Sequence, residues 1–190
     1  MLYKVLVFIL NIVLRLVYRV RVHGNVELLE EEGYLICSNH GHILDPVFLA
    51  MVFKKQINFM GKEELFQNKF MAFILPKVGV FSVNRDGNDV RALKTAIKIL
   101  KDGRNVGLFI EGTRVKEINI ENAKPGAVMI ANIAKTNIIP VHISTTYRLF
   151  SRIDIYIRDV KEIDKIDFKA LGSDGYEIVA QDILKEIYNI

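Results

Sequence analysis

The chain has 190 residues, 51% of them hydrophobic, and a formal net charge of +4 at pH 7. This length is typical of one domain that buries a sizeable core. The single cysteine, Cys37, excludes an internal disulfide framework and fits a reducing cytosol. The basic excess suits a phosphate-bearing ligand or an anionic membrane surface. Nucleic acid is not an expected partner, because no basic run is interleaved with aromatic residues.

The first twenty residues, MLYKVLVFILNIVLRLVYRV, are strongly apolar. No small-residue cleavage site follows them, so a secretory signal peptide is not expected. The uncharged run between Lys4 and Arg15 corresponds to about 15 Å of helix, whereas a membrane span has to cross roughly 30 Å of hydrocarbon. A transmembrane helix is therefore not expected either.

The polar residues of this segment favour a third interpretation. Lys4, Asn11, Arg15 and Arg19 are spaced by 7, 4 and 4 residues, which puts them on one face of a helix opposite a wide apolar surface. We predict that residues 1–20 form an amphipathic helix that lies in the membrane interface. The alternative is a buried core helix whose basic side chains extend to solvent.

In the rest of the chain, short apolar runs rich in β-branched residues alternate with amphipathic runs. The short runs predict strands at 34–38, 57–61, 78–83, 106–110, 137–143 and 152–157. Helical spacing predicts helices at 45–53, 62–75, 125–135 and 173–190, with Asp45 as an N-cap before Pro46. It also predicts a helix that runs from Asn88 or Asp89 to a terminating Gly103. This alternation predicts one α/β domain, residues 21–190, with a central, largely parallel or mixed sheet flanked by helices.

Three polar clusters follow predicted strands. They are Asn39-His40-Gly41-His42 with nearby Asp45, then Arg85, and then the run 111–114, EGTR. Open α/β sheets build their sites at the carboxyl ends of strands, so these clusters are expected to converge if their strands are parallel neighbours.

The first cluster suits proton transfer. A histidine accepts a proton from a hydroxyl best when a carboxylate holds its other ring nitrogen, a pairing that His40 and Asp45 would provide. No serine or threonine forms a nucleophile elbow beside them, so the nucleophile would be a substrate hydroxyl and His40 its general base. Taken alone, the loop is equally compatible with an N-cap aspartate and two histidines that have no catalytic role.

A metal-dependent hydrolase that uses His40, His42 and Asp45 is the other functional hypothesis for this loop. The aspartate falls one position late for the His-x-His-x-Asp-His pattern of binuclear zinc hydrolases. Only His23 and His142 remain to complete a shell of three or four zinc ligands.

The other clusters are suited to an anion. Arg85 lies in a turn-rich exit from a strand, where an arginine can bind a phosphate through two parallel hydrogen bonds. Gly112 lets the backbone approach a ligand closely, and Arg114 and Lys124 add positive charge. Each of these features is common on protein surfaces and is weak on its own.

Together the clusters form an ordered series of four blocks. Asn39-His40-x₄-Asp45 is followed by Gly-x-Phe-x-x-x-Arg at 79–85, by the run 111–114 and by IIPV at 138–141. The series resembles the glycerolipid acyltransferase family, in particular the 1-acyl-sn-glycerol-3-phosphate acyltransferases, over roughly residues 20–145. The chain departs from many members in having His42 where they carry serine, and Val115 where serine often follows EGTR.

The resemblance implies that the chain transfers a fatty acyl group from acyl-CoA or acyl-ACP to the free hydroxyl of 1-acyl-sn-glycerol 3-phosphate, giving phosphatidate. It implies no covalent acyl-enzyme, no cofactor and no metal. His40 would be the general base and Asp45 its orienting carboxylate. The residues that would bind or shape the pocket for the acceptor phosphate are Arg85, Glu111, Gly112, Thr113, Arg114 and Lys124.

The resemblance also implies a membrane-resident acceptor, which the helix 1–20 would reach from the cytoplasmic face of the cell membrane. Acyl carrier protein would then be a partner if it is the acyl donor. Another lysophospholipid or glycerol 3-phosphate remains an alternative acceptor, because apolar pockets discriminate weakly. The longer glycerol-3-phosphate acyltransferases are expected to be less similar, since this chain leaves little room for a large C-terminal extension.

Overall fold

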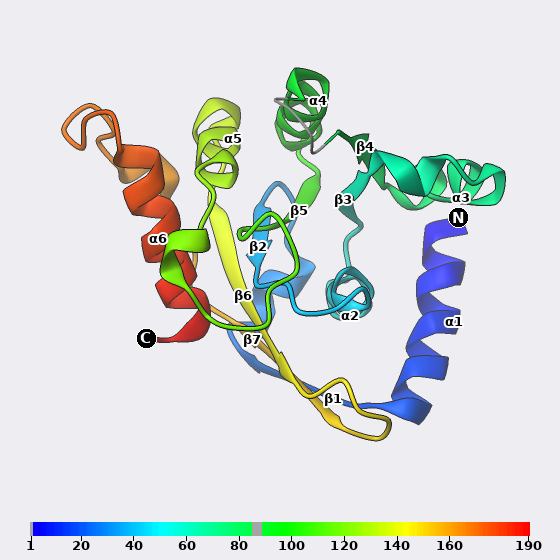
Figure 1. Ribbon diagram of the computed structural model, residues 1–190. Coiled ribbons are helices and arrows are strands. Elements are labelled where there is room, and N and C mark those ends of the chain that lie inside the picture. Colours follow the sequence, from blue (N-terminus) through cyan, green and yellow to red (C-terminus); the bar gives the residue numbers. More distant parts are fainter. Residues whose placement is uncertain (1, 85–88) are drawn as a thin grey trace.

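A computed structural model describes residues 2–84 and 89–190 (Figure 1). In this part of the chain, seven strands form one sheet in the order β1-β7-β6-β2-β5-β3-β4. Neighbouring strands are parallel except β6 and β7, which are antiparallel. The predicted α/β domain with a mixed sheet is confirmed. The strands are β1 Arg19–Gly24, β2 Leu35–Ser38, β3 Ile57–Lys62, β4 Phe81–Val83, β5 Asn105–Phe109, β6 Ile138–Thr145 and β7 Arg152–Ile157.

Helices cover both faces of this sheet, as Figure 1 shows. They are α1 Leu2–Val17, α2 Asp45–Val52, α3 Lys69–Ile74, α4 Val90–Lys101, α5 Gly126–Ala134 and α6 Gly175–Tyr188. Because successive side chains of a strand point to opposite faces, the central strand β2 contributes to two cores. Leu35 and Cys37 pack with α4, α5 and α6, whereas Ile36 packs with α1 and α2.

The prediction of one helix over residues 1–20 is wrong at its end. α1 stops at Val17, and Arg19 begins β1, which pairs in parallel with β7. Arginine and valine alternate in this strand, so the arginines are exposed and Val20 and Val22 are half-buried. Arg19 therefore does not belong to the polar face of the helix.

One polar residue of α1, Asn11, contacts α2, while Lys4 and Arg15 of the same face are exposed. The amide of Asn11 donates to the backbone carbonyl of Met51 (3.3 Å), and Nε of Arg15 donates to Oδ1 of Asn11 (2.6 Å). Leu14 is the only residue of α1 that is buried, so the alternative of a buried core helix does not hold. The large apolar residues that α1 exposes are Leu2, Val5, Phe8, Ile9, Leu10, Ile12, Val13 and Leu16. None of the helices in the described ranges has the length and apolar character that a membrane crossing requires.

The helix predicted over 62–75 is divided. β3 continues to Lys62, a 3-10 turn covers Glu63–Phe66, and α3 starts at Lys69. The side chain of Asn68 causes the restart, because its oxygen accepts from the N–H groups of Phe70 and Met71 as an N-cap.

Candidate active site

The register of the two central strands brings the first and third clusters together. Ser38 and Phe109 are paired at the ends of the parallel strands β2 and β5. His40 and Glu111, each two residues further on, are therefore neighbours, and the N–H of His40 donates to Oε2 of Glu111 (2.8 Å). The second cluster follows β4, which lies at the sheet edge beyond β3, and Arg85 is outside the described residues.

His40 and Asp45 form a buried pair. Nδ1 of His40 lies 2.9 Å from Oδ2 of Asp45, and the same oxygen accepts from the N–H groups of Gly41 (2.8 Å) and His42 (2.7 Å). Because a carboxylate can only accept, Nδ1 carries the proton and Nε2 is left with its lone pair. The expected N-cap role of Asp45 is wrong, since α2 begins at Asp45 itself and its carboxylate turns back to hold the loop.

An aromatic stack supports the ring of His40 from below. The imidazole of His40 stacks on the ring of Phe109, with 3.9 Å between ring centroids. Phe109 in turn stacks on Phe59, with 6.2 Å between centroids. Gly107 makes room for this stack, because a Cβ at that position would lie 2.3 Å from the ring of Phe59. The orientation of the imidazole is thus fixed by packing as well as by hydrogen bonding.

Glu111 holds the backbone of the histidine loop. Its side chain is buried, and its second oxygen, Oε1, accepts from the hydroxyl of Tyr188 in α6 (3.0 Å). Burial raises the pKa of Glu111, while the hydrogen bonds from His40 and Tyr188 lower it by a smaller amount. Both carboxylate oxygens are therefore used by donors within the protein.

Backbone contacts tie the loop after β5 to the loop after β2. The N–H of Val115 donates to the carbonyl of His40 (2.8 Å). The side-chain amide of Asn39 bridges to β6 by donating to the carbonyl of Ile143 (3.0 Å) and accepting from its N–H (2.8 Å). These bonds hold His40 between three neighbouring segments of chain.

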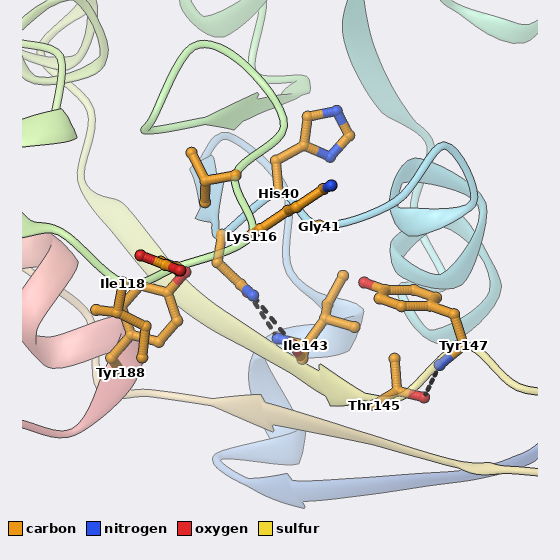
Figure 2. Close-up of a pocket in the computed structure, with 11 residues that line it drawn as sticks. His40, Gly41, Lys116, Ile118, Ile143, Thr145, Tyr147 and Tyr188 are labelled. Atoms are coloured by element: carbon orange, nitrogen blue, oxygen red, sulfur yellow. Dashed lines mark hydrogen bonds between the residues drawn. The ribbon is translucent and has the colours of Figure 1, made fainter.

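A cavity of about 320 Å³ opens above this arrangement. Figure 2 shows Tyr188, from α6, on one side of it and Tyr147, just after β6, on the other, with Lys116 near His40. The residues that line it are Asn39, His40, Gly41, Val115, Lys116, Glu117, Ile118, Ile143, Thr145, Tyr147 and Tyr188.

The predicted phosphate ligands lie in the turn beside this cavity. Thr113, Arg114 and Lys124 are exposed, and the side chain of Lys124 passes over Gly112, which has a φ of 70°. Within residues 2–84 and 89–190, neither Arg114 nor Lys124 has a side-chain hydrogen bond or ion pair, and the same is true of Lys116. Lys116 lines the cavity and was not singled out from the sequence.

The metal-site hypothesis has little geometric support. The ring of His42 stacks on Tyr147 with 4.5 Å between centroids, and its Nδ1 accepts from the N–H of Leu44 (3.3 Å). In the described part of the chain, no three His, Cys, Asp or Glu side chains are grouped as metal ligands would be.

Two tyrosines of the site were missed by sequence reasoning. Tyr147 donates to Asp45 from 102 residues away, and Tyr188 donates to Glu111 from 77 residues away. No local motif marks either residue, because only the fold brings each one to its partner.

Comparison with known proteins identifies the family. The profile described as "Acyltransferase" matches residues 19–144. A 1-acyl-sn-glycerol-3-phosphate acyltransferase of Bacillus subtilis is 36% identical over 73% of this chain and 69% of its own length. A protein of the same name from Streptococcus pneumoniae is 32% identical over 85% of this chain, which spans only 61% of that relative.

The fold agrees with these matches. The crystal structure of the 1-acyl-sn-glycerophosphate acyltransferase from Thermotoga maritima superposes with a TM-score of 0.68, at 23% identity, over 91% of this chain and 73% of that one. The predicted resemblance to an O-acyltransferase is confirmed: the chain belongs to the acyltransferase family.

Proposed function

We propose that this chain transfers a fatty acyl group from an acyl thioester to the free hydroxyl of 1-acyl-sn-glycerol 3-phosphate, with His40 as the general base. The observation that carries the proposal is the hydrogen bond between His40 Nδ1 and the buried Asp45 (2.9 Å), beside a cavity that His40 lines. The names of the relatives from Bacillus subtilis and Streptococcus pneumoniae support the choice of acceptor.

The proton transfers follow from the tautomer of His40. Nε2 of His40 takes the proton of the acceptor hydroxyl, while the hydroxyl oxygen attacks the carbonyl carbon of the thioester. Asp45 stabilises the imidazolium that forms. The carbon–sulfur bond then breaks, and the departing thiolate takes the proton back from Nε2. No step requires a metal or a cofactor, and either acyl-CoA or acyl-ACP supplies the thioester.

The acceptor phosphate is assigned to the basic turn beside the cavity. Arg114 and Lys124 are exposed there without partners among the described residues, and Lys116 reaches the cavity itself. Arg85 remains a predicted contributor. Glu111 acts indirectly in this scheme, because its carboxylate fixes the loop of His40.

We also place the chain on the cytoplasmic face of the cell membrane, where its lipid acceptor resides. The support is the outward apolar face of α1, on which residues such as Phe8 and Leu16 are exposed by 66% and 75%. Exposed apolar patches of this extent mark interaction surfaces, and a bilayer interface is the partner that an amphipathic helix fits.

The experiment is acyl transfer with purified protein in vesicles containing lysophosphatidate, supplied first with acyl-CoA and then with acyl-ACP. Mass spectrometry detects the lipid product. Phosphatidate from the wild type and from His23→Ala, but not from His40→Ala, is the expected result. His23 is a suitable control because its Nε2 lies 2.8 Å from Oδ1 of Asp154, a similar histidine–aspartate pair that does not line the cavity. Full turnover by His40→Ala would refute the assignment of the base.

The acceptor is tested in the same vesicles by replacing lysophosphatidate with another lysophospholipid or with glycerol 3-phosphate. If one of these acceptors gives product and lysophosphatidate gives none, the chain is an acyltransferase but its acceptor is not lysophosphatidate.

A further inference from the structure

Tyr147 supplies the hydrogen bond that completes the shell of Asp45. Oδ2 of Asp45 is used by His40, Gly41 and His42, and Oδ1 accepts from the hydroxyl of Tyr147. The side chain of Asp45 is 0% exposed. No other described residue bonds Oδ1, so the tyrosine hydroxyl is the group that satisfies it.

The fold holds Tyr147 tightly in this position. Its backbone has a φ of 54°, a left-handed conformation that is uncommon for a residue with a side chain. Its N–H donates to Oγ1 of Thr145 (3.2 Å), and its ring stacks on His42. Strained backbone that persists beside a catalytic pair is a reason to look for function there.

The hydroxyl is also a permanent donor. Burial and the neighbouring Asp45 raise the pKa of Tyr147 far above its ordinary value, so the phenol stays protonated over the whole working range of pH. A buried carboxylate oxygen without a donor is costly, and it regains one by rotating or by admitting water. Either change would displace Oδ2 from Nδ1 of His40.

We propose that Tyr147 is a positioning residue of the acyl transfer. Its hydroxyl fixes the Asp45 carboxylate so that His40 keeps its Nδ1 hydrogen bond and presents Nε2 to the acceptor hydroxyl. The inference rests on the proposed function, because it assigns His40 the role of base. It adds a third member, from the segment that follows β6, to the pair carried by the loop after β2.

The test is Tyr147→Phe, which removes the hydroxyl and keeps the ring on His42. A displacement of about 1 Å in a positioned catalytic group costs on the order of a hundredfold, so kcat should fall about ten- to a hundredfold. The KM for lysophosphatidate should change by less than about twofold, because no contact with the acceptor is lost.

The pH profile separates positioning from general damage. Without the tyrosine donor, Oδ2 of Asp45 moves away from Nδ1 and stabilises the protonated form of His40 less strongly. The acidic limb of the kcat profile should therefore move to lower pH. 3-Fluorotyrosine, a stronger donor, draws charge from the Asp45 carboxylate, so it should also move this limb to lower pH, and it serves if the phenylalanine variant does not fold.

Tyr176→Phe is the matched control. It removes a tyrosine hydroxyl at the N-terminal end of α6, which accepts from the side chain of Asn132 (2.9 Å) and does not line the cavity of His40. Kinetics and pH profile equal to this control in both Tyr147 variants would overturn the proposal. A proton NMR spectrum keeps the test independent of the acceptor. The downfield Nδ1–H resonance of His40 should shift in the Tyr147 variants and not in the control, even if lysophosphatidate is not the substrate.

Discussion

At the scale of single residues, Arg114 is the clearest candidate for recognising the acceptor phosphate. It is exposed beside the cavity and has no partner among the described residues. Arg114→Ala should raise the KM for lysophosphatidate about tenfold or more and leave kcat nearly unchanged, if the contact is equal in the ground and transition states. Steady-state kinetics would measure this, with Arg104→Ala as control, since Arg104 pairs with Asp102 before β5 (3.1 Å). A fall in kcat at constant KM would contradict the assignment.

Glu111 gives a prediction about pH. Because burial raises its pKa, the folded chain keeps the Glu111 proton at pH values where the unfolded chain has released it. The folded state then binds more protons, so the contribution of Glu111 to stability falls as pH rises above the ordinary value of 4.5.

Urea unfolding of the wild type and Glu111→Gln measures this effect. The stability of the wild type relative to the variant should decline from pH 4 to pH 7, because glutamine does not titrate there. Glu117→Gln, which removes an exposed carboxylate from the same loop, is the control. Parallel curves for the wild type and Glu111→Gln would show that the Glu111 carboxylate is not buried in solution.

At the scale of elements, α1 and its outward apolar face determine how the protein meets lipid. Burying one large apolar side chain contributes about 1.5 kcal/mol or more, which is roughly tenfold in an equilibrium constant. Phe8→Ser combined with Leu16→Ser should therefore weaken binding to anionic vesicles by about a hundredfold.

Vesicle flotation would measure this partition. The matched control is Ile133→Ser with Ile178→Ser, which removes exposed isoleucines from α5 and α6. Equal losses in both double variants would mean that α1 has no special part in membrane binding.

The element scale also shows what periodicity can decide. The strand 152–157 has the predicted bounds, and α4 begins within two residues of its predicted start, because both depend on local pattern. β1 was missed because Arg19, four residues after Arg15, continues the spacing of the polar helix face. The period-two alternation of Val20 and Val22 was the contrary signal in the same residues.

At the scale of the whole molecule, Cys37 reports on global unfolding. It lies in the central strand β2 with no exposed surface, and burial raises its pKa to about 12. A thiol dye should therefore label no cysteine in native protein during an acyl-transfer assay and one per chain in denaturant. Absorbance titration checks this. Rapid labelling of native protein would contradict the burial of Cys37 in β2. If the native protein is not labelled, the same dye can be used to measure the thiol that the acyl donor releases.

The candidate site shows how far one sequence can lead. His40, Asp45 and Glu111 could be predicted because they lie in short motifs after strands. The buried role of Glu111 could not, because it depends on the register of β2 with β5 and on a tyrosine in the last helix. Tyr147 and Tyr188 carry no signal until the whole sheet and α6 are in place.

The glycine in β5 has a consequence for reading mutational tolerance. Gly107 touches no substrate in the proposed reaction, yet the ring of Phe59 occupies the space that a side chain would need, and that ring backs the stack beneath His40. In a saturation screen selected on activity, this position should be depleted of substitutions nearly as strongly as the histidine itself. The loss of activity there would result from displacement of Phe59 and Phe109, and with them the ring of His40, and not from a lost contact with substrate.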